Sequence, residues 1–555
     1  MLSQRGQGAA PSLRPVLGAE ALAHDLTELD GLDYLSAPRG AIAEAQALAA
    51  AAFGAGRTWF LVNGTTAGIH AAVLASCRPG DAVVLGRNCH ASALAACALA
   101  GAVPFFAEAE ADDSLGVSRA VTPAAAALAL DAAAAACAAA PQRSTIKNKN
   151  RPRVALLLVV SPTYCGAAAD VAGLAREAHA RGVPLAVDEA HGAHLTFARA
   201  AATNHCGNGG DDDDALRRAL AALPPPALAA GADVAVQSTH KTLPAVTQAA
   251  MLHAAAGGRV GAERLSAALL LLHTSSPSYL LLASLDAARA HAATGAPLAA
   301  AMRRAMRARE ALAALAPALH MLGPAHVDGA GVAAVDLTRL AIGTAGLGVS
   351  GYAIAAAMAA EGVTPELVAP RCVAFVLGGG TTDGDVDRLV AALARVASQA
   401  QGSHARDDAA QLPQLPPPPP LAMTPRRAVF ARRERVPFAH AAGRISADTL
   451  CPYPPVRNTF IADCFASLYV AVACSHLTHR RLPLISSLIS TRAQGIPVAF
   501  PGSVLTPEAL RYCAAVLAAG GAVTGGADPA CATLDVVAAD EQPPPGASLW
   551  DAPDG

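Results

Sequence analysis

The stretch ADVAVQSTHKT, residues 232–242, runs from an apolar segment into a polar turn that contains Lys241. The same pattern, an apolar run followed by a Gly, Pro, Ser or Thr turn and then by helix-forming sequence, repeats through residues 25–395. This repetition predicts an α/β fold with a mostly parallel sheet covered on both faces, in which ligands bind at the carboxyl ends of the strands. The predicted strands are residues 59–62, 82–85, 154–160, 184–187 and 234–237.

The composition excludes several classes of protein. The chain has 41 Lys and Arg against 43 Asp and Glu, so its formal charge of −2 at pH 7 provides no positive field for nucleic acid. Alanine makes up about half of the hydrophobic share of 53%, and the most apolar stretches, residues 123–140 and 267–285, are too short or too polar to span a membrane. Twelve cysteines without a C-x-x-C pair favour a reducing compartment and indicate neither a disulfide framework nor a metal site.

Composition also divides the chain into domains. Residues 1–24 are predicted to be disordered, and because they contain arginine before any acid, a plastid or mitochondrial transit peptide is the alternative to a cytoplasmic location. Residues 25–399 form the major domain, with an acidic and Pro-rich surface insertion at about residues 200–228 that is expected not to order itself. Residues 400–422, which end in five prolines, form a stiff linker. Residues 423–555 form a smaller α/β domain.

Lys241 and Asp188 are the residues that point most directly to chemistry. Each follows a predicted buried strand, where a charge is costly unless it is paired or used. The two residues form either an ion pair or part of a pyridoxal phosphate site, which needs a lysine for the aldehyde and an acid facing the pyridinium nitrogen. The turn NGTTAG, residues 63–68, is either an ordinary helix cap or a phosphate site. His90, in the loop RNCHAS, is either solvated or stacked on an aromatic ring.

Six motifs in residues 25–395 carry a family resemblance: NGTTAGI, RNCHAS, SPTYCG, VDEAHGAH, STHKTL and HTSSPSYLLLASLD. In this order and spacing they resemble the bacterial-type ornithine/lysine/arginine decarboxylases. MTPRRAVF, GRISADTLCPYPP and GIPVAFPG resemble the C-terminal domain of that family. The resemblance implies a type I pyridoxal-phosphate-dependent (aspartate aminotransferase-like) large domain and a smaller C-terminal α/β domain. It also implies decarboxylation of arginine, lysine or ornithine to the corresponding amine and CO₂ in polyamine-type metabolism.

Carried over residue by residue, the resemblance implies a role for each site residue. Lys241 would form the Schiff base with pyridoxal 5′-phosphate, Asp188 would keep the ring nitrogen protonated, and His90 would stack on the ring, which makes these three the expected catalytic residues. Ala190 would pack on the other ring face, and His191 would line the site without an assigned role. The residues expected at the phosphate are Gly64, Thr65, Thr66, Ser238, His240 and Thr274, of which Thr274 would come from the partner subunit of a homodimer.

Two departures from the family pattern keep other functions open. The N-terminal arm with a PGH-type motif that usually precedes the DLTEL-like segment has no counterpart in residues 1–23, and Ser503 stands where the family usually has a glutamate. The alternatives are an inactive or regulatory protein that retains the fold, and another type I enzyme such as an aldolase or aminotransferase.

The C-terminal domain contains a foreign-looking segment. The family runs YPP directly into GIP, whereas here residues 456–494 separate the two motifs. The segment is rich in Ser, Thr, Cys and Leu, and it opens with valine and closes with glutamine, whose codons are compatible with splice sites. Our hypothesis is a retained intron. The alternative is a lineage-specific insertion in a surface turn.

Overall fold

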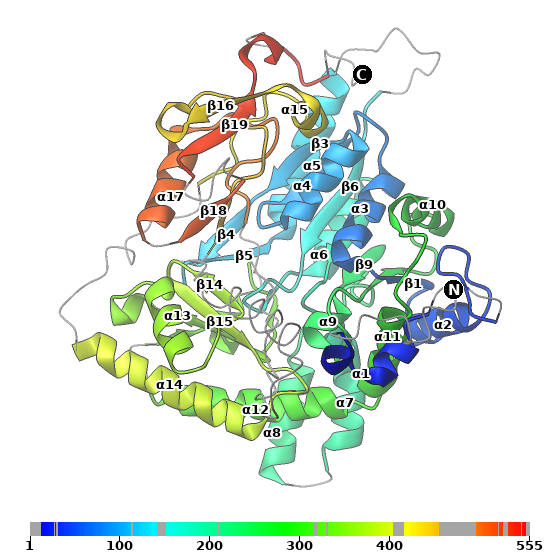
Figure 1. Ribbon diagram of the computed structural model, residues 1–555, viewed down its shortest axis with the longest axis vertical. Coiled ribbons are helices and arrows are strands. Elements are labelled where there is room, and N and C mark those ends of the chain that lie inside the picture. Colours follow the sequence, from blue (N-terminus) through cyan, green and yellow to red (C-terminus); the bar gives the residue numbers. More distant parts are fainter. Residues whose placement is uncertain are drawn as a thin grey trace.

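The structure, a computed structural model, shows three units (Figure 1). A large α/β unit forms the centre, a second unit that contains helices α12 to α14 lies below it, and the C-terminal unit lies at the upper left. The described residues are 13–26, 28, 31–112, 115–140, 151–207, 210–315, 319–328, 331–402, 416–453, 496–519, 521–525, 531–544 and 547–550.

The central unit is built on a seven-stranded sheet. All neighbouring strands are parallel except for β10, which runs antiparallel to β9 and β1. All five predicted strands are present as β1, β2, β6, β8 and β9. Strands β3 and β10 were not predicted, because Pro104 and His253 interrupt their apolar patterns. In sheet order the strands are β1 (Arg57–Leu61), β10 (Ala250–Ala254), β9 (Val234–Gln237), β8 (Leu185–Asp188), β6 (Val154–Val160), β2 (Ala82–Gly86) and β3 (Val103–Ala107).

Both faces of the sheet are buried, as predicted. Leu156 and Leu158 of β6 pack in a cluster with α3, α4 and α10 on one face, and Leu157 and Val159 pack with α5 and α6 on the other. Helix α2 and helix α11 cover β1 and β10. The bounds of these helices are α2 (Ala41–Phe53), α3 (Gly64–Ser76), α4 (Ala91–Ala100), α5 (Pro123–Ala139), α6 (Val171–Ala180), α10 (Ala262–Leu272) and α11 (Tyr279–Ala293).

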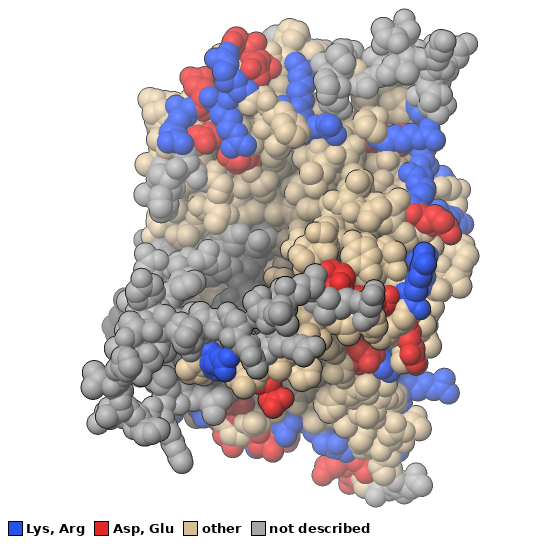
Figure 2. All heavy atoms as spheres, turned by 45° about the vertical axis from the view of Figure 1, so that its right-hand side comes forward, with Lys and Arg blue, Asp and Glu red and all other residues tan. Residues whose placement is uncertain are grey.

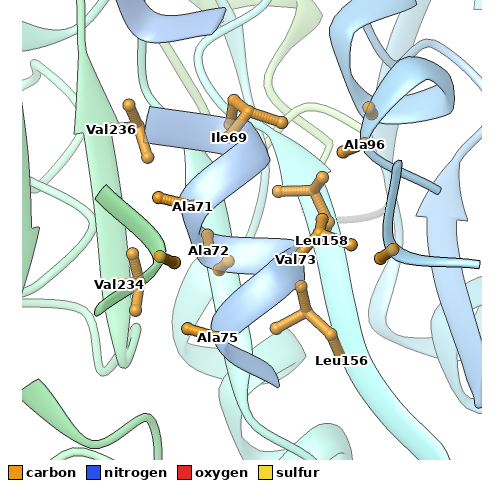
Figure 3. Packing of buried hydrophobic residues seen from close by; sticks show 14 of the residues in the cluster. Ile69, Ala71, Ala72, Val73, Ala75, Ala96, Leu156, Leu158, Val234 and Val236 are labelled. Atoms are coloured by element: carbon orange, nitrogen blue, oxygen red, sulfur yellow. The ribbon is translucent and has the colours of Figure 1, made fainter. Parts of the chain in front are cut away.

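Helix α3 lies close to the sheet because its inner face consists of small residues. Figure 3 shows Ala71, Ala72 and Ala75 among the strand side chains Val234 and Val236. A Cβ atom on Gly68 would lie 2.4 Å from Cγ1 of Val236, so only glycine permits this approach. The first turn of α3 is thereby brought next to the carboxyl end of β9.

The second unit is a four-stranded antiparallel sheet, ordered β11, β13, β15, β14. Its helices pack around a core that includes Leu340, Ile342 and Phe375. Its elements are α12 (Ala296–Ala313), β11 (His320–Met321), β13 (Arg339–Gly343), α13 (Gly351–Ala360), β14 (Leu367–Ala369), β15 (Cys372–Val376) and α14 (Asp383–Gly402). Further short elements are the hairpin of β4 (Ala109–Asp112) and β5 (Val117–Val121), the antiparallel pair of β7 (Ala167–Ala168) and β12 (Ala334–Val335), and the 3₁₀ turns η2 (Pro324–His326) and η3 (Ala345–Leu347).

The C-terminal unit has its own core, which includes Val498, Leu505, Cys513 and Val536. Its elements are α15 (Pro425–Phe430), β16 (Arg433–Pro437), η5 (Phe438–His440), β17 (Cys451–Tyr453), α17 (Pro507–Ala518), β18 (Ala522–Thr524), β19 (Thr533–Val537) and η6 (Ala539–Glu541). The buried guanidinium of Arg87 joins this unit to the central one, because it donates to the carbonyl oxygens of Pro497 at 2.7 Å and Pro416 at 3.1 Å. Pro416 belongs to the predicted linker, whose first residues, 400–402, instead end α14.

Two predictions of disorder are wrong where the structure describes the residues. Within residues 1–24, helix α1 (Arg14–Ala23) forms, with a proline in its first turn and Leu22 buried. In the acidic insertion, helix α7 (Ala198–His205) and helix α8 (Asp211–Ala221) form, and all four aspartates lie in the first turn of α8. Negative charge is stabilising at a helix N-terminus, and α8 buries Leu216 and Leu220, so the acidic run begins a helix.

The hypothesis of a retained intron concerns residues 456–494, which lie outside the described residues.

On the face shown in Figure 2, basic and acidic side chains are interspersed. Within the described ranges, no helix is long and apolar enough to cross a membrane.

Candidate active site

Asp188 is the last residue of β8, and its carboxyl group is buried with 7% of the residue exposed. Its Oδ1 accepts a hydrogen bond from the backbone N–H of Ala190 at 3.2 Å. Burial raises the pKa of Asp188, while the positive charge of Lys241 and the Ala190 hydrogen bond act against this rise. The positive charge of Lys241 therefore acts on the carboxyl group of Asp188, and Ala190 is also buried.

Lys241 lies on the single helical turn α9 (Thr239–Thr242), directly after β9. Its Nζ atom lies 3.1 Å from Nε2 of His191 and 5.5 Å from the ring centroid of Tyr164. Burial lowers the pKa of Lys241, and the negative charges of Asp188 and Glu366 oppose this shift. A lowered pKa makes more of the uncharged, nucleophilic amine available.

Four of the predicted phosphate residues lie at the start of α3 and just before α9: Gly64, Thr65, Thr66 and Ser238. Thr65 Oγ1 lies 3.1 Å from Ser238 Oγ, which joins the first turn of α3 to the residue before α9. Gly64 begins the helix with a φ of +68°, a conformation that favours glycine. The backbone N–H groups of a first helical turn, here at Thr65 and Thr66, have no partner within the helix and form a natural anion site.

His240 has a different contact from the one expected. Its Nδ1 donates to the carbonyl oxygen of Ala249 at 2.9 Å, so one ring nitrogen holds the α9 turn on the start of β10. Burial lowers the pKa of His240, which keeps the ring neutral. The remaining nitrogen, Nε2, is the atom left for a phosphate contact.

His90 caps helix α4, and this contact orients its ring. Nδ1 accepts from the backbone N–H of Ser92 at 3.1 Å. Since Nδ1 accepts, the proton of the neutral ring is on Nε2. His90 also lies close enough to His191 to contribute to the lowered pKa of that residue.

Comparisons with known proteins show the family of this chain. The family model for the Orn/Lys/Arg decarboxylase major domain matches residues 5–384. The chain belongs to this family. It is 33% identical to the arginine decarboxylase of Bacillus subtilis over 528 residues, which cover 95% of this chain and 91% of that protein. It is 28% identical to the lysine decarboxylase LdcA of Pseudomonas aeruginosa over 277 residues, or 49% of this chain and 34% of that protein.

Solved structures confirm the type I fold. Lysine decarboxylase A from Pseudomonas aeruginosa superposes with a TM-score of 0.70 over 96% of this chain and 77% of that one, at 22% identity. The constitutive lysine decarboxylase of Escherichia coli gives a TM-score of 0.68 over 97% of this chain and 78% of that one, at 18% identity. This family member is therefore a pyridoxal-phosphate-dependent amino-acid decarboxylase with the predicted α/β architecture.

Thr274 is the predicted site residue that this single chain of the decarboxylase does not bring to Lys241. It is exposed between α10 and α11, and its Oγ1 accepts from the backbone N–H of Ser276 at 3.2 Å. Its assignment to the site of a partner subunit stays a prediction.

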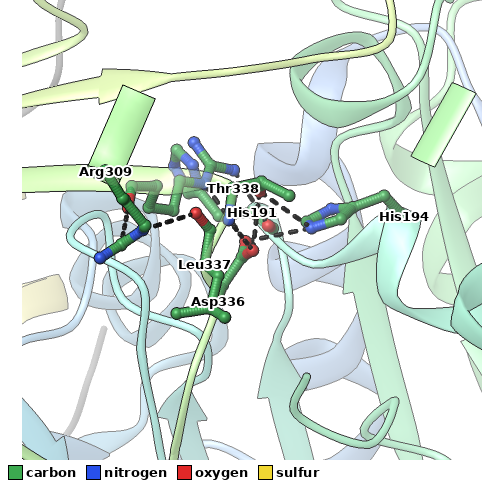
Figure 4. A network of polar contacts seen from close by, with 7 residues as sticks. His191, His194, Arg309, Asp336, Leu337 and Thr338 are labelled. Carbon is green, nitrogen blue, oxygen red and sulfur yellow. Dashed lines mark hydrogen bonds and ion pairs between the residues drawn. The ribbon is translucent and has the colours of Figure 1, made fainter. Parts of the chain in front are cut away.

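The decarboxylase site also contains residues that the sequence analysis missed (Figure 4). Arg339 is 1% exposed and donates to the carbonyl oxygen of His191 at 3.0 Å. Figure 4 shows its neighbours His191, His194 and Asp336. Asp336 Oδ2 lies 3.0 Å from His194 Nε2 and 3.4 Å from Arg339 Nε. Although burial raises the pKa of Asp336, His194 and Arg339 hold it well below its ordinary value. The sequence feature that could have predicted Asp336 and Arg339 is their spacing of three residues in the segment DLTRL, residues 336–340.

This network connects the second unit to Lys241. Burial first, and the positive charges of Lys241 and Arg339 next, lower the pKa of His191 well below its ordinary value, so its ring is neutral beside the lysine. The ring centroids of His191 and Tyr164 are 4.5 Å apart. His191, which had no assigned role, is therefore a direct neighbour of the Lys241 amine, and Arg339 holds its backbone in place.

Proposed function

We propose that this chain decarboxylates arginine with pyridoxal 5′-phosphate held by Lys241, Asp188 and the first turn of α3. The observation that carries the proposal is the position of Lys241, whose buried amine has a lowered pKa and interacts with the buried acid Asp188. Arginine is favoured over lysine and ornithine because the relative at 33% identity over nearly the whole chain is named an arginine decarboxylase.

The residues present fit this cofactor. Lys241 supplies an amine for the aldehyde, and Asp188 supplies a buried carboxylate for a protonated ring nitrogen. The free N–H groups at Thr65 and Thr66 and the hydroxyl of Ser238 suit a phosphate. Buried polar atoms without a hydrogen-bond partner among the described residues, including Nδ1 of His191, lie around the same turn.

When bound, pyridoxal phosphate supplies an electron sink for the electron pair left as CO₂ departs. Asp188 holds a proton at the ring nitrogen, which makes that sink effective. His90 would pack against the ring and limit its orientation, and Ala190 would also contact the cofactor. Lys241 would hold the cofactor, and its Nζ, which has Nε2 of His191 as a hydrogen-bond partner, would be the group that returns a proton to the substrate carbon.

The charge around Lys241 supports a basic substrate. Glu366, in the second unit, acts on Lys241 together with Asp188, so two carboxylates contribute negative potential to this space. We propose that Glu366 lies near the positively charged end of the substrate side chain.

A homodimer completes the proposal. Thr274 is exposed, and the adjacent residues Leu270 and Leu271 at the end of α10 are 61% and 80% exposed. Apolar exposure of this size beside a predicted site residue favours a subunit interface there. Sedimentation velocity should give a dimer, and Leu271→Asp should shift it toward the monomer with a loss of activity.

The deciding experiment is an assay of CO₂ release from carboxyl-labelled arginine, lysine and ornithine with the purified protein and pyridoxal phosphate. We expect the highest kcat/KM with arginine. A higher value with lysine or ornithine contradicts the substrate assignment, and release from none of the three contradicts the proposed function.

A further inference from the structure

A chain of four buried side chains crosses the sheet next to the Lys241 turn. Gln237 Nε2 donates to Glu189 Oε2 at 2.7 Å, and Glu189 Oε1 accepts from the backbone N–H of Ala227 at 2.8 Å. Gln237 Oε1 lies 3.1 Å from His253 Nε2, and His253 Nδ1 lies 2.8 Å from Thr58 Oγ1. The exposed fraction of each of these four side-chain-bearing residues is 2% or less.

The four hydrogen-bonded side chains and the side chain of Asp188 point to opposite faces of the sheet. Successive residues of a strand alternate between faces, so Glu189 follows Asp188 on the other side. His253 pairs with Thr58 on β1 and with Ala235 on β9, and Gln237 is two residues beyond Ala235, which puts all these side chains on one face. The buried chain is therefore separate from the groups expected to touch the cofactor.

The direction of every hydrogen bond in the chain follows from the ionised form of Glu189. Both carboxylate oxygens accept, so Gln237 must present its NH₂ group to Glu189 and its carbonyl oxygen to His253. The ring of His253 then carries its proton on Nε2, and Nδ1 accepts from the hydroxyl of Thr58. Each polar atom named here has a partner, which is the condition under which a buried polar network is stable.

Burial controls the charges in this chain. It lowers the pKa of His253 to about 3, so the ring is neutral. It raises the pKa of Glu189 to about 7, while the hydrogen bonds from Gln237 and Ala227 act in the opposite direction. The ionisable residues nearest to Glu189 in the sequence are Asp188, on β8, and His191, in the following turn.

Glu189 holds the end of β9 at two points. Its side chain binds Gln237, the last residue of β9, and its backbone N–H donates to the carbonyl oxygen of Val236 at 2.9 Å. Ser238 follows immediately, and its carbonyl oxygen accepts from the N–H of Lys241 at 3.0 Å. A movement of Gln237 therefore moves Ser238, which is hydrogen-bonded to the backbone N–H of Lys241.

We propose that Glu189 is a positioning residue for Lys241. Its ionised carboxylate sets the direction of the chain through Gln237, His253 and Thr58, and this chain holds the end of β9 where the Lys241 turn requires it. The inference rests on the proposed function in one respect, the role of Lys241 as the residue that holds the cofactor.

Loss of the negative charge on Glu189 reverses the direction of the hydrogen bonds that link Glu189, Gln237, His253 and Thr58. A glutamine at position 189, or a protonated Glu189, has a donor facing Gln237, so the Gln237 amide must turn over. Its NH₂ group then faces Nε2 of His253, and the single proton of that ring moves to Nδ1 and points to Thr58. The position of this proton reports the state of Glu189 without any measurement of activity.

The first experiment locates the proton on His253 by neutron diffraction of the perdeuterated protein. We expect Nε2 to carry it in the parent and Nδ1 in Glu189→Gln. The parent also provides the test if the variant does not fold, because the ring proton of its His253 should move from Nε2 to Nδ1 when the pH is lowered from about 8.5 to about 5.5. The same nitrogen in all of these states overturns the proposal.

The second experiment follows Lys241 in the cofactor-free protein. Only three lysines, Lys147, Lys149 and Lys241, occur in the sequence, so ¹³C-methylated lysine gives few NMR signals. We expect Glu189→Gln to shift the titration of Lys241 by about half a pH unit, and Glu263→Gln, on an exposed position of α10, to leave it unchanged. An unchanged Lys241 titration in a variant whose His253 proton has moved overturns the positioning role.

Kinetics provide the third measurement. With pyridoxal phosphate and substrate, Glu189→Gln should lower kcat about fivefold and change KM less than about twofold. Equal kcat in the variant and the parent refutes the inference. Failure of the proposed function has a different signature, because an inactive parent still shows the His253 proton and the Lys241 titration in the cofactor-free protein.

Discussion

Two sets of buried polar groups surround the Lys241 turn, and they differ in how completely they are paired. In the chain from Glu189 to Thr58, each side-chain oxygen and nitrogen described above has a partner. Around Lys241, by contrast, His191 Nδ1, His194 Nδ1, Thr239 Oγ1 and Thr242 Oγ1 have no hydrogen-bond partner among the described residues.

This difference indicates what each set does. Buried polar atoms in folded proteins are nearly always hydrogen-bonded, so a cluster of exceptions marks groups that serve something other than stability. The first set includes Gln237 at the end of β9, and the second includes Thr239 and Thr242 of the α9 turn. Changes in the first set should therefore affect stability and position, and changes in the second should affect turnover and cofactor binding.

The largest effect is expected from Lys241→Ala. The change removes both the covalent anchor and the proton carrier, so CO₂ release should fall by about 10³-fold or more while the thermal unfolding temperature stays close to that of the parent. Arg176→Ala, at an exposed position of α6, is the control. Near-parental turnover without Lys241 is incompatible with its assigned role.

Asp188→Asn should have the next largest effect. The amide fills the same space but cannot hold a proton at the ring nitrogen by its charge, so we expect kcat to fall about a hundredfold. Cofactor affinity, measured by spectrophotometric titration, should change much less than kcat. A variant that loses cofactor affinity and keeps its kcat assigns Asp188 to binding alone.

A change at His253, in the fully hydrogen-bonded set, should alter how the free energy of unfolding depends on pH. Burial lowers the pKa of His253 from its ordinary 6.5 to about 3, so the unfolded chain binds a proton that the folded protein excludes in this pH range. The free energy of unfolding should fall as the pH falls below 6.5, and between about pH 6.5 and about pH 4.5 His253→Gln should remove about 2 kcal/mol of this dependence.

The measurement is urea unfolding of the parent and His253→Gln at several pH values. Glu189 titrates in both proteins, so its contribution largely cancels in the difference between them. Parallel stability curves for the two proteins show that His253 is not the group responsible.

Thr65→Val should have the smallest effect of the four. It removes the hydroxyl that contacts Ser238 and leaves the backbone N–H groups of α3 in place. We expect the Kd of pyridoxal phosphate to rise about tenfold, the equivalent of one hydrogen bond to a charged group. Ser118→Ala, on β5, should not change it, and equal affinities in the two variants remove Thr65 from the phosphate site.

Much of the fold could be read from the sequence because the strands of a covered parallel sheet are continuous apolar runs. Lys241 and Asp188 were predicted for the same reason, since a charge directly after such a run is conspicuous. β10 was missed because His253, a member of the buried chain, breaks its apolar pattern. The acidic run was misinterpreted because composition alone does not show that four aspartates occupy a helix N-terminus.

The sequence by itself determined the α/β class, five of the seven sheet strands and the two charged residues at the ends of β8 and β9. These features depend on local patterns of apolar and polar residues. Only the tertiary structure decided that His191 contacts Lys241, that Arg339 holds the backbone of His191, and that Glu189 is connected to Thr58. Such contacts join residues that are as far apart in the chain as 58 and 253, and their geometry follows from how the strands pair and how the second unit packs against the first.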